Sequence, residues 1–104
     1  MARFDVYTNP APSDRAGIPY FLDVQSDHLD QMETRVVVPL YLSSRFASPV
    51  LRLNPELKVG GKSVVMNTIE IGALPTGVLR RAVVNVASEQ FVIQDALDTL
   101  FGTY

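Results

Sequence analysis

The stretch TRVVVPLYL, residues 34–42, decides the fold. It is rich in β-branched residues and almost entirely apolar, which is typical of a strand buried on both faces of a sheet. Proline lacks a backbone N–H group, so Pro39 predicts a bulge or a sheet edge within this run. A strand of this kind needs partners, and the residues on either side are expected to supply them.

Toward the N-terminus the sequence predicts two more strands. Apolar and polar residues alternate over residues 2–7, which is the period of a half-buried strand. Residues 18–25 repeat the pattern, with one apolar face made of Tyr20, Leu22 and Val24. Between these strands, residues 9–17 hold two prolines, a glycine and several turn-forming residues, so this segment is expected to be a loop.

Toward the C-terminus the pattern predicts a hairpin and two further strands. The hairpin is expected at residues 57–67, because Gly60 and Gly61 tolerate the positive φ angles of a tight turn. The strand candidates are residues 69–73 and 78–86, which are separated by a short turn-forming segment.

A helix is expected at the end of the chain, where the apolar period changes. Its apolar residues recur at helical spacing: Ile93, Ala96, Leu97, Leu100 and Phe101. Ser88 is the expected N-cap, and Gly102 the expected left-handed residue that ends the helix. The sequence thus predicts one domain over residues 1–104, mostly β with one C-terminal α-helix. We expect a strongly bent antiparallel sheet or partial barrel that the helix closes on one side.

Composition excludes several classes of protein. The chain has 104 residues, 47% of them hydrophobic, with no cysteine and one histidine, so disulfides and sulfur-ligated metals are excluded. The apolar runs are far too short to cross a bilayer, and no signal peptide is visible. We therefore expect a cytoplasmic protein without a membrane partner.

The charges are unevenly placed around a net charge of −2. Residues 43–81 hold six basic and two acidic side chains, whereas residues 82–104 hold three acids and no base. This pattern is compatible with two faces of opposite sign, and equally with an ordinary solvated surface. A dominant basic stripe with interleaved aromatic residues is missing, so sequence-specific nucleic-acid binding is not expected.

No catalytic constellation stands out. Asp27, His28 and Asp30 could hold an ion weakly, but a solvated loop explains them better, and any Ser-His-Asp triad would need the same His28. We therefore expect neither an enzyme nor a cofactor. The acidic and aromatic chain end favours a tip that receives a cationic partner, although Phe101 packed into the core is the simpler interpretation.

The sequence resembles the CcdB family of bacterial toxins over essentially its whole length. The segments that carry the resemblance are FDVY at 4–7, YFLDVQSDHLD at 20–30, RVVVPL at 35–40, LNP at 53–55, MNT at 66–68 and LP at 74–75. The resemblance implies an SH3-like small barrel with an extra small antiparallel sheet and a C-terminal helix, assembled as a homodimer. It also implies poisoning of DNA gyrase through the A subunit and neutralisation by a CcdA-like antitoxin.

The gyrase-contacting positions of the family fall on a loop and on the chain end. They correspond to Ser26, His28, Leu29, Asp98, Phe101, Gly102 and Thr103. His28 replaces an aliphatic residue and Asp98 an asparagine. The family ends in Trp-Gly-Ile, and Phe101 takes the tryptophan place if one extra residue is allowed at the end; an ungapped alignment puts Gly102 there. These departures leave open whether gyrase poisoning is retained.

Two further interfaces are expected. An acidic, disordered antitoxin segment should dock on the basic middle region around Arg45, Arg52, Arg80 and Arg81. A homodimer should use the aliphatic surface that one small barrel does not need: Val36, Val37, Val38, Val64, Val65, Val83, Val84 and Val86.

Three functions remain open. The chain is a gyrase poison, a homologue that binds its antitoxin but has lost gyrase poisoning, or an RNA-cleaving toxin of the MazF/Kid type. The last requires an acid–base set on the barrel face, and the sequence suggests none.

Overall fold

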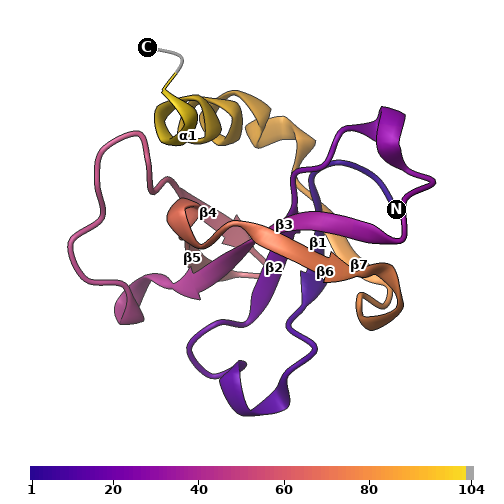
Figure 1. The fold of residues 1–104 in the computed structure, drawn as a ribbon. Helices are drawn as coiled ribbons and strands as arrows, with labels where there is room; N and C mark the ends of the chain where they lie inside the picture. Colours follow the sequence, from indigo (N-terminus) through magenta and orange to yellow (C-terminus); the bar gives the residue numbers. More distant parts are fainter. Residues whose placement is uncertain (103–104) are drawn as a thin grey trace.

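Strand β3 (Thr34–Leu42) lies at the centre of the sheet (Figure 1). In the computed structural model, which describes residues 1–102, every strand pairing is antiparallel. The strand order is β4-β5-β3-β2-β1-β7, and β6 branches from β3 beside β5. The other strands within these residues are β1 (Asp5–Thr8), β2 (Tyr20–Asp23), β4 (Glu56–Val59), β5 (Lys62–Met66), β6 (Gly72–Pro75) and β7 (Ala82–Asn85).

Pro39 lies where β3 changes partner. The first half of β3 pairs with β6 and the second half with β5, while β2 runs along the opposite side of both halves. The carbonyl of Pro39 accepts a hydrogen bond from the Asn67 N–H at 3.0 Å, so the proline nitrogen faces the same gap between β5 and β6. The missing donor therefore costs the sheet no ladder hydrogen bond. Pro39 marks a break between two partners, and β3 itself is a central strand.

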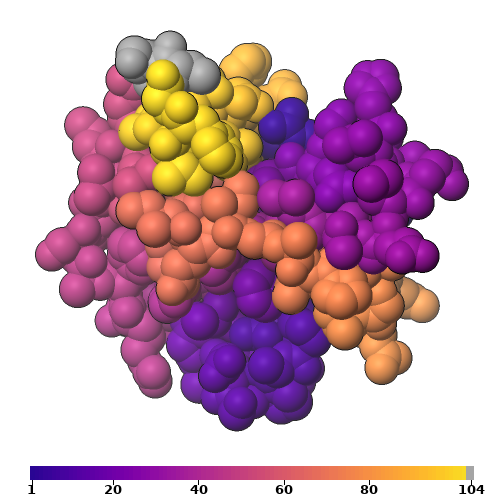
Figure 2. All heavy atoms as spheres, in the orientation of Figure 1, coloured from indigo at the N-terminus to yellow at the C-terminus, as the bar shows by residue number. Residues whose placement is uncertain are grey.

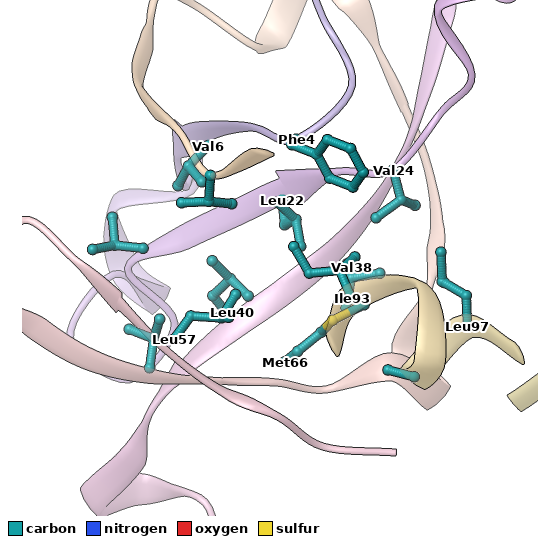
Figure 3. Packing of buried hydrophobic residues seen from close by; sticks show 14 residues of the cluster. Phe4, Val6, Leu22, Val24, Val38, Leu40, Leu57, Met66, Ile93 and Leu97 are labelled. Atoms are coloured by element: carbon teal, nitrogen blue, oxygen red, sulfur yellow. The ribbon is translucent and has the colours of Figure 1, made fainter. Parts of the chain in front are cut away.

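The main core lies between the bent sheet and helix α1 (Gln90–Phe101). The helix buries Ile93, Ala96 and Leu97 against the sheet, and Figure 3 shows Ile93 beside Val38 and Met66. This predicted apolar face is confirmed up to Leu97. The helix ends at Gly102, whose φ of 79° is left-handed and whose N–H donates to the Asp98 carbonyl at 2.9 Å, as predicted.

The opposite face of the sheet carries a smaller core with a buried ion pair. Tyr7, Val37 and Leu79 form the apolar part. Asp23 and Arg35 lie fully buried, and Arg35 donates from Nε to Oδ2 at 2.7 Å and from Nη2 to Oδ1 at 3.0 Å. The hydrogen bond with Asp23 raises the pKa of Arg35, so the guanidinium stays charged despite its burial.

The fold class expected from the sequence is confirmed: the protein is a mostly antiparallel β half-barrel with one C-terminal helix. The hairpin at the two glycines is also present, with φ of 55° at Gly60 and 79° at Gly61.

Several element boundaries were wrong. The first strand begins at Asp5 because Phe4 adopts a left-handed φ of 74°. In the 69–73 candidate, a 3₁₀ turn (Thr68–Glu70) precedes β6, so the strand is shifted toward the C-terminus. Only residues 82–85 of the 78–86 candidate form a strand.

The predicted N-cap at Ser88 is also wrong, because Ser88 lies inside a 3₁₀ turn (Ala87–Glu89) that precedes the helix. The Asn85 side chain accepts from the Ala87 N–H at 2.9 Å and so supports the start of that turn.

The valines expected at a dimer interface belong mostly to the core of the protomer. Five of them are buried within one chain: Val37, Val38, Val64, Val65 and Val86. Val83 and Val84 of β7 are exposed, at 52% and 41%. Most of the valines that the sequence suggested for a dimer interface are therefore buried within the protomer, because the bent sheet buries apolar side chains on both of its faces.

Candidate functional site

The end of helix α1 forms an exposed tip. The Phe101 ring is 67% exposed, so it does not pack into the core, and the simpler sequence interpretation is wrong. Gly102 is also exposed, and its left-handed backbone turns the chain at this point. Thr103 and Tyr104 lie outside the described residues. An exposed aromatic ring at a helix end can pack against an apolar or cationic partner surface.

The second predicted segment is the turn after β2. Ser26 opens a 3₁₀ turn (Asp27–Leu29), and its hydroxyl oxygen accepts from the His28 N–H at 3.2 Å. Ser26 and His28 are exposed, and Leu29 is 49% exposed. The buried Gln25 side chain donates to the Leu29 carbonyl at 2.8 Å and accepts from the Val36 N–H. The turn therefore presents polar and aliphatic side chains on a braced backbone.

Arg3 joins this turn to the helix. Its backbone N–H donates to the Asp27 carboxylate at 2.8 Å, and its guanidinium donates to Gln94 Oε1, also at 2.8 Å. Gln94 in turn donates from Nε2 to Asp98 Oδ1 at 2.9 Å. In Figure 1 the N-terminal segment passes beside both the turn and the helix. A continuous hydrogen-bond chain thus connects Asp27 with Asp98.

The predicted gyrase-contacting residues therefore fall into two groups that Arg3 couples within one chain. One group is the turn with Ser26, His28 and Leu29; the other is the helix end with Asp98, Phe101 and Gly102. Sequence reasoning missed Arg3 and Gln94 as connectors. No local pattern signals them, because the two side chains that meet lie 91 positions apart in the chain.

The four arginines of the predicted antitoxin region do not share one surface depression. Arg45 lies in a hollow beside Tyr41 and Asp14. Arg52 borders an apolar hollow and pairs with Asp95 of the helix, with Nη2–Oδ1 at 2.7 Å. Arg80 and Arg81 line a third hollow. The basic middle region of the sequence is therefore spread over three places.

Residues 1–102 contain no cluster of three or more potential metal ligands, and no helix among them is long and apolar enough to span a membrane. Two tyrosines on the sheet have raised pKa values. Burial, aided by the negative charges of Asp5 and Asp23, raises the pKa of Tyr7 to about 12. A hydrogen bond to Glu70 raises the pKa of the Tyr41 phenol. The exposed turn and helix end offer polar, aliphatic and aromatic side chains to a partner.

Comparison with known protein families identifies the family of the chain. The family model of the CcdB protein matches residues 3–102, which include the turn, the connecting Arg3 and the helix end. Proteins of this family are toxins that act without catalysing a reaction. The chain therefore belongs to the CcdB family and is a toxin of the CcdB type.

Proposed function

We propose that this protein binds the A subunit of DNA gyrase and traps the complex of gyrase with cleaved DNA. The observation that carries the proposal is the exposed tip at the end of α1, in a chain whose family match extends through Gly102. Phe101 supplies a ring for stacking, and Asp98 lies one helical turn before it. A cation from gyrase on that ring would contribute roughly 0.5–2 kcal/mol.

The proposed active form is a homodimer. Two copies related by a two-fold axis would present two tips, and the A subunits of gyrase are themselves a two-fold pair. A symmetric toxin could then contact both A subunits at once, which raises the effective concentration of the second contact. Apolar side chains exposed in one chain are available for the dimer contact, among them Ile69 at 66% and Val83 at 52%.

A CcdA-like antitoxin is the proposed neutralising partner, and the cytoplasm the proposed location. The antitoxin segment is expected to be acidic and to fold on binding to part of the basic middle region, which holds Arg45, Arg52, Arg80 and Arg81. Complementary charge should make association faster at low salt than at high salt. An on-rate that stays constant over that range would remove the arginines from the interface.

A homologue that has lost gyrase poisoning is the second candidate function. The observation that favours it is the composition of the tip. His28 is an exposed polar residue at a position where the family has an aliphatic contact, and Phe101 provides a weaker cation–π surface than tryptophan. These differences lie on the exposed site and leave the core intact.

The decisive experiment is a gyrase cleavage assay with the purified full-length protein, alongside induced expression in bacteria. Accumulation of cleaved DNA and arrest of growth would support the first function. Intact DNA and normal growth, with a folded protein that still binds an antitoxin peptide, would establish the second. Degradation of cellular RNA without gyrase-linked cleavage would overturn both in favour of an RNA-cleaving toxin.

A further inference from the structure

A hollow on the sheet end away from α1 gathers three arginines from two distant segments. Arg15 comes from the loop after β1, and Arg80 and Arg81 come from the segment that leads into β7. The hollow has a volume of about 410 Å³ and is also lined by Thr8 and Val78. In Figure 2 the indigo loop that follows β1 and the orange segment before β7 lie side by side at this end.

The backbone holds both segments in place. Arg15 Nε donates to the Asn9 carbonyl at 2.5 Å. Asn9 is 3% exposed, and its side chain donates to the Ile18 carbonyl at 2.8 Å and accepts from the Ala11 N–H at 2.9 Å. The loop that carries Arg15 is therefore braced from within.

The two other arginines are held between fixed neighbours. The preceding residue, Leu79, is 4% exposed in the smaller core, and the following residue, Ala82, pairs with Tyr7 in the sheet. Arg80 and Arg81 themselves are exposed. Little backbone entropy is left to lose when a ligand binds to such a segment.

The charge of the hollow is not compensated within the described chain. Among residues 1–102, Arg35 pairs with Asp23 and Arg52 pairs with Asp95, whereas the three arginines of the hollow form no ion pair. The residues that line the hollow include no acid. Three guanidinium groups around one depression repel one another, and an anion placed between them relieves that repulsion.

We propose that the hollow lined by Arg15, Arg80 and Arg81 binds an acidic peptide segment that places at least two carboxylates in it. Guanidinium groups bind carboxylates in bidentate fashion, and Thr8 and Val78 can contact the methylene groups that carry them. The inference deepens the proposed function by giving the antitoxin one anchor, and it rests on that function for the identity of the natural ligand. It also replaces Arg45 and Arg52 as the main contacts, since they lie in other hollows.

Nucleic acid fits this surface less well. A DNA-binding protein contacts several phosphates along a continuous basic stripe. Here three arginines occupy one small hollow on a chain whose net charge is −2. The observations therefore favour a short acidic segment of a protein, bound locally.

The test is fluorescence anisotropy with the full chain and a short glutamate-rich peptide labelled with fluorescein. We expect Arg15→Gln, Arg80→Gln and Arg81→Gln to weaken binding about threefold each, and about tenfold or more together. The matched control for the double variant Arg80→Gln with Arg81→Gln removes two charges elsewhere, by Lys58→Gln and Lys62→Gln. The control should bind nearly as the wild type does, and a peptide with glutamine at each glutamate should not bind.

Three outcomes would overturn the proposal. The first is equal weakening in the control variant, which would reduce the effect to net charge. The second is equal binding of the glutamine peptide. The third is displacement of the acidic peptide by a duplex oligonucleotide at lower concentration, which would make the hollow a nucleic-acid site. If the combined variant does not fold, peptide binding by the three single variants provides the test. Gyrase is absent from this assay, so failure here leaves the gyrase proposal untouched, and failure of gyrase poisoning leaves this result standing.

Discussion

At the scale of single residues, the buried pair of Asp23 and Arg35 makes the core sensitive to substitution. Both side chains are fully buried, and Arg35 Nη1 has no hydrogen-bond partner among residues 1–102. Burying two charges costs solvation energy, which their mutual attraction only partly repays. Removal of one partner is therefore expected to destabilise the protein far more than the intact pair stabilises it.

We expect Asp23→Ala to destabilise the protein by about 3–5 kcal/mol, because it leaves the Arg35 charge buried without a carboxylate. The double variant Asp23→Leu with Arg35→Met should recover most of that loss, because it removes both charges. Guanidinium chloride unfolding of the three proteins measures both differences. Equal stability of the single and double variants would show that the charges are not the source of the effect.

The raised pKa of Tyr7 predicts how the stability of the protein changes at alkaline pH. Burial, together with Asp5 and Asp23, raises its pKa from 10.0 to about 12 in the folded protein. A raised pKa means that the folded state holds the phenolic proton more tightly. The resulting stabilisation is complete below pH 10 and is lost as the pH rises toward 12.

We expect the free energy of unfolding of the wild type to fall by roughly 2–3 kcal/mol more than that of Tyr7→Phe over this range. Near neutral pH the variant should lose only the hydrogen bond to Asp5, about 1 kcal/mol. Urea unfolding at several pH values measures the difference, and parallel curves for the two proteins would contradict it.

Substitution of Phe101 tests the role of the tip in gyrase binding without disturbing the core. The ring is 67% exposed, so Phe101→Ala should change the free energy of unfolding by no more than about 0.5 kcal/mol. We expect it to weaken gyrase binding at least about tenfold, as expected when an aromatic anchor is truncated. The matched control is Phe91→Ala, at the opposite end of the same helix and 80% exposed. Surface plasmon resonance on immobilised gyrase A subunit compares them, and similar losses in both variants would move the contact away from the tip.

At the scale of elements, the β4–β5 hairpin depends on its two glycines. Gly61 has a φ of 79° with open space where a side chain would begin, so Gly61→Ala tests backbone strain alone. We expect a loss of about 1–2 kcal/mol, because the left-handed conformation is costly for alanine. Gly77 also has open space but no positive φ, so Gly77→Ala should be neutral or slightly stabilising. Thermal unfolding separates the two, and equal melting temperatures would contradict the explanation.

The elements that sequence predicted well are those fixed by local chemistry. The bounds of β3 agree with the β-branched run, because a strand that is buried on both faces over most of its length is mainly apolar, with the paired Arg35 as its charged exception. The hairpin follows from the pair Gly60 and Gly61, and the helix end follows from Gly102. By contrast, the position of β6 depends on its pairing with β3, and the left-handed Phe4 is held by hydrogen bonds to Asp23 and Val86. Long-range contacts of this kind produce no pattern in the neighbouring sequence from which they could be predicted.

The same distinction applies to the candidate site. The turn and the helix end could be located from the family resemblance, and both are exposed in the structure. The sequence could not predict the connection through Arg3 or the division of the four arginines among three hollows. Both depend on how distant segments meet once the sheet bends.

At the scale of the whole molecule, the proposed dimer is open to a direct test. Light scattering at micromolar concentration should give a mass near twice the chain mass of 11.5 kDa. We expect Val83→Lys to shift the equilibrium toward the monomer, because a charge would replace an exposed apolar side chain of edge strand β7. Lys58→Glu on the other edge strand, β4, serves as the control. A mass near 11.5 kDa for the wild type would rule out the dimer.

The pairing of β1 with β7 has a consequence for how the protein is made. Asp5 lies opposite Asn85 in the sheet, so the first strand acquires its second neighbour only after most of the chain has been synthesised. The helix that closes the main core, and with it the tip, follows later still. Contacts between such distant parts of a chain form slowly, because a long loop must first be closed. The main core therefore cannot close, and the tip cannot take its place beside the sheet, before the helix itself has been synthesised.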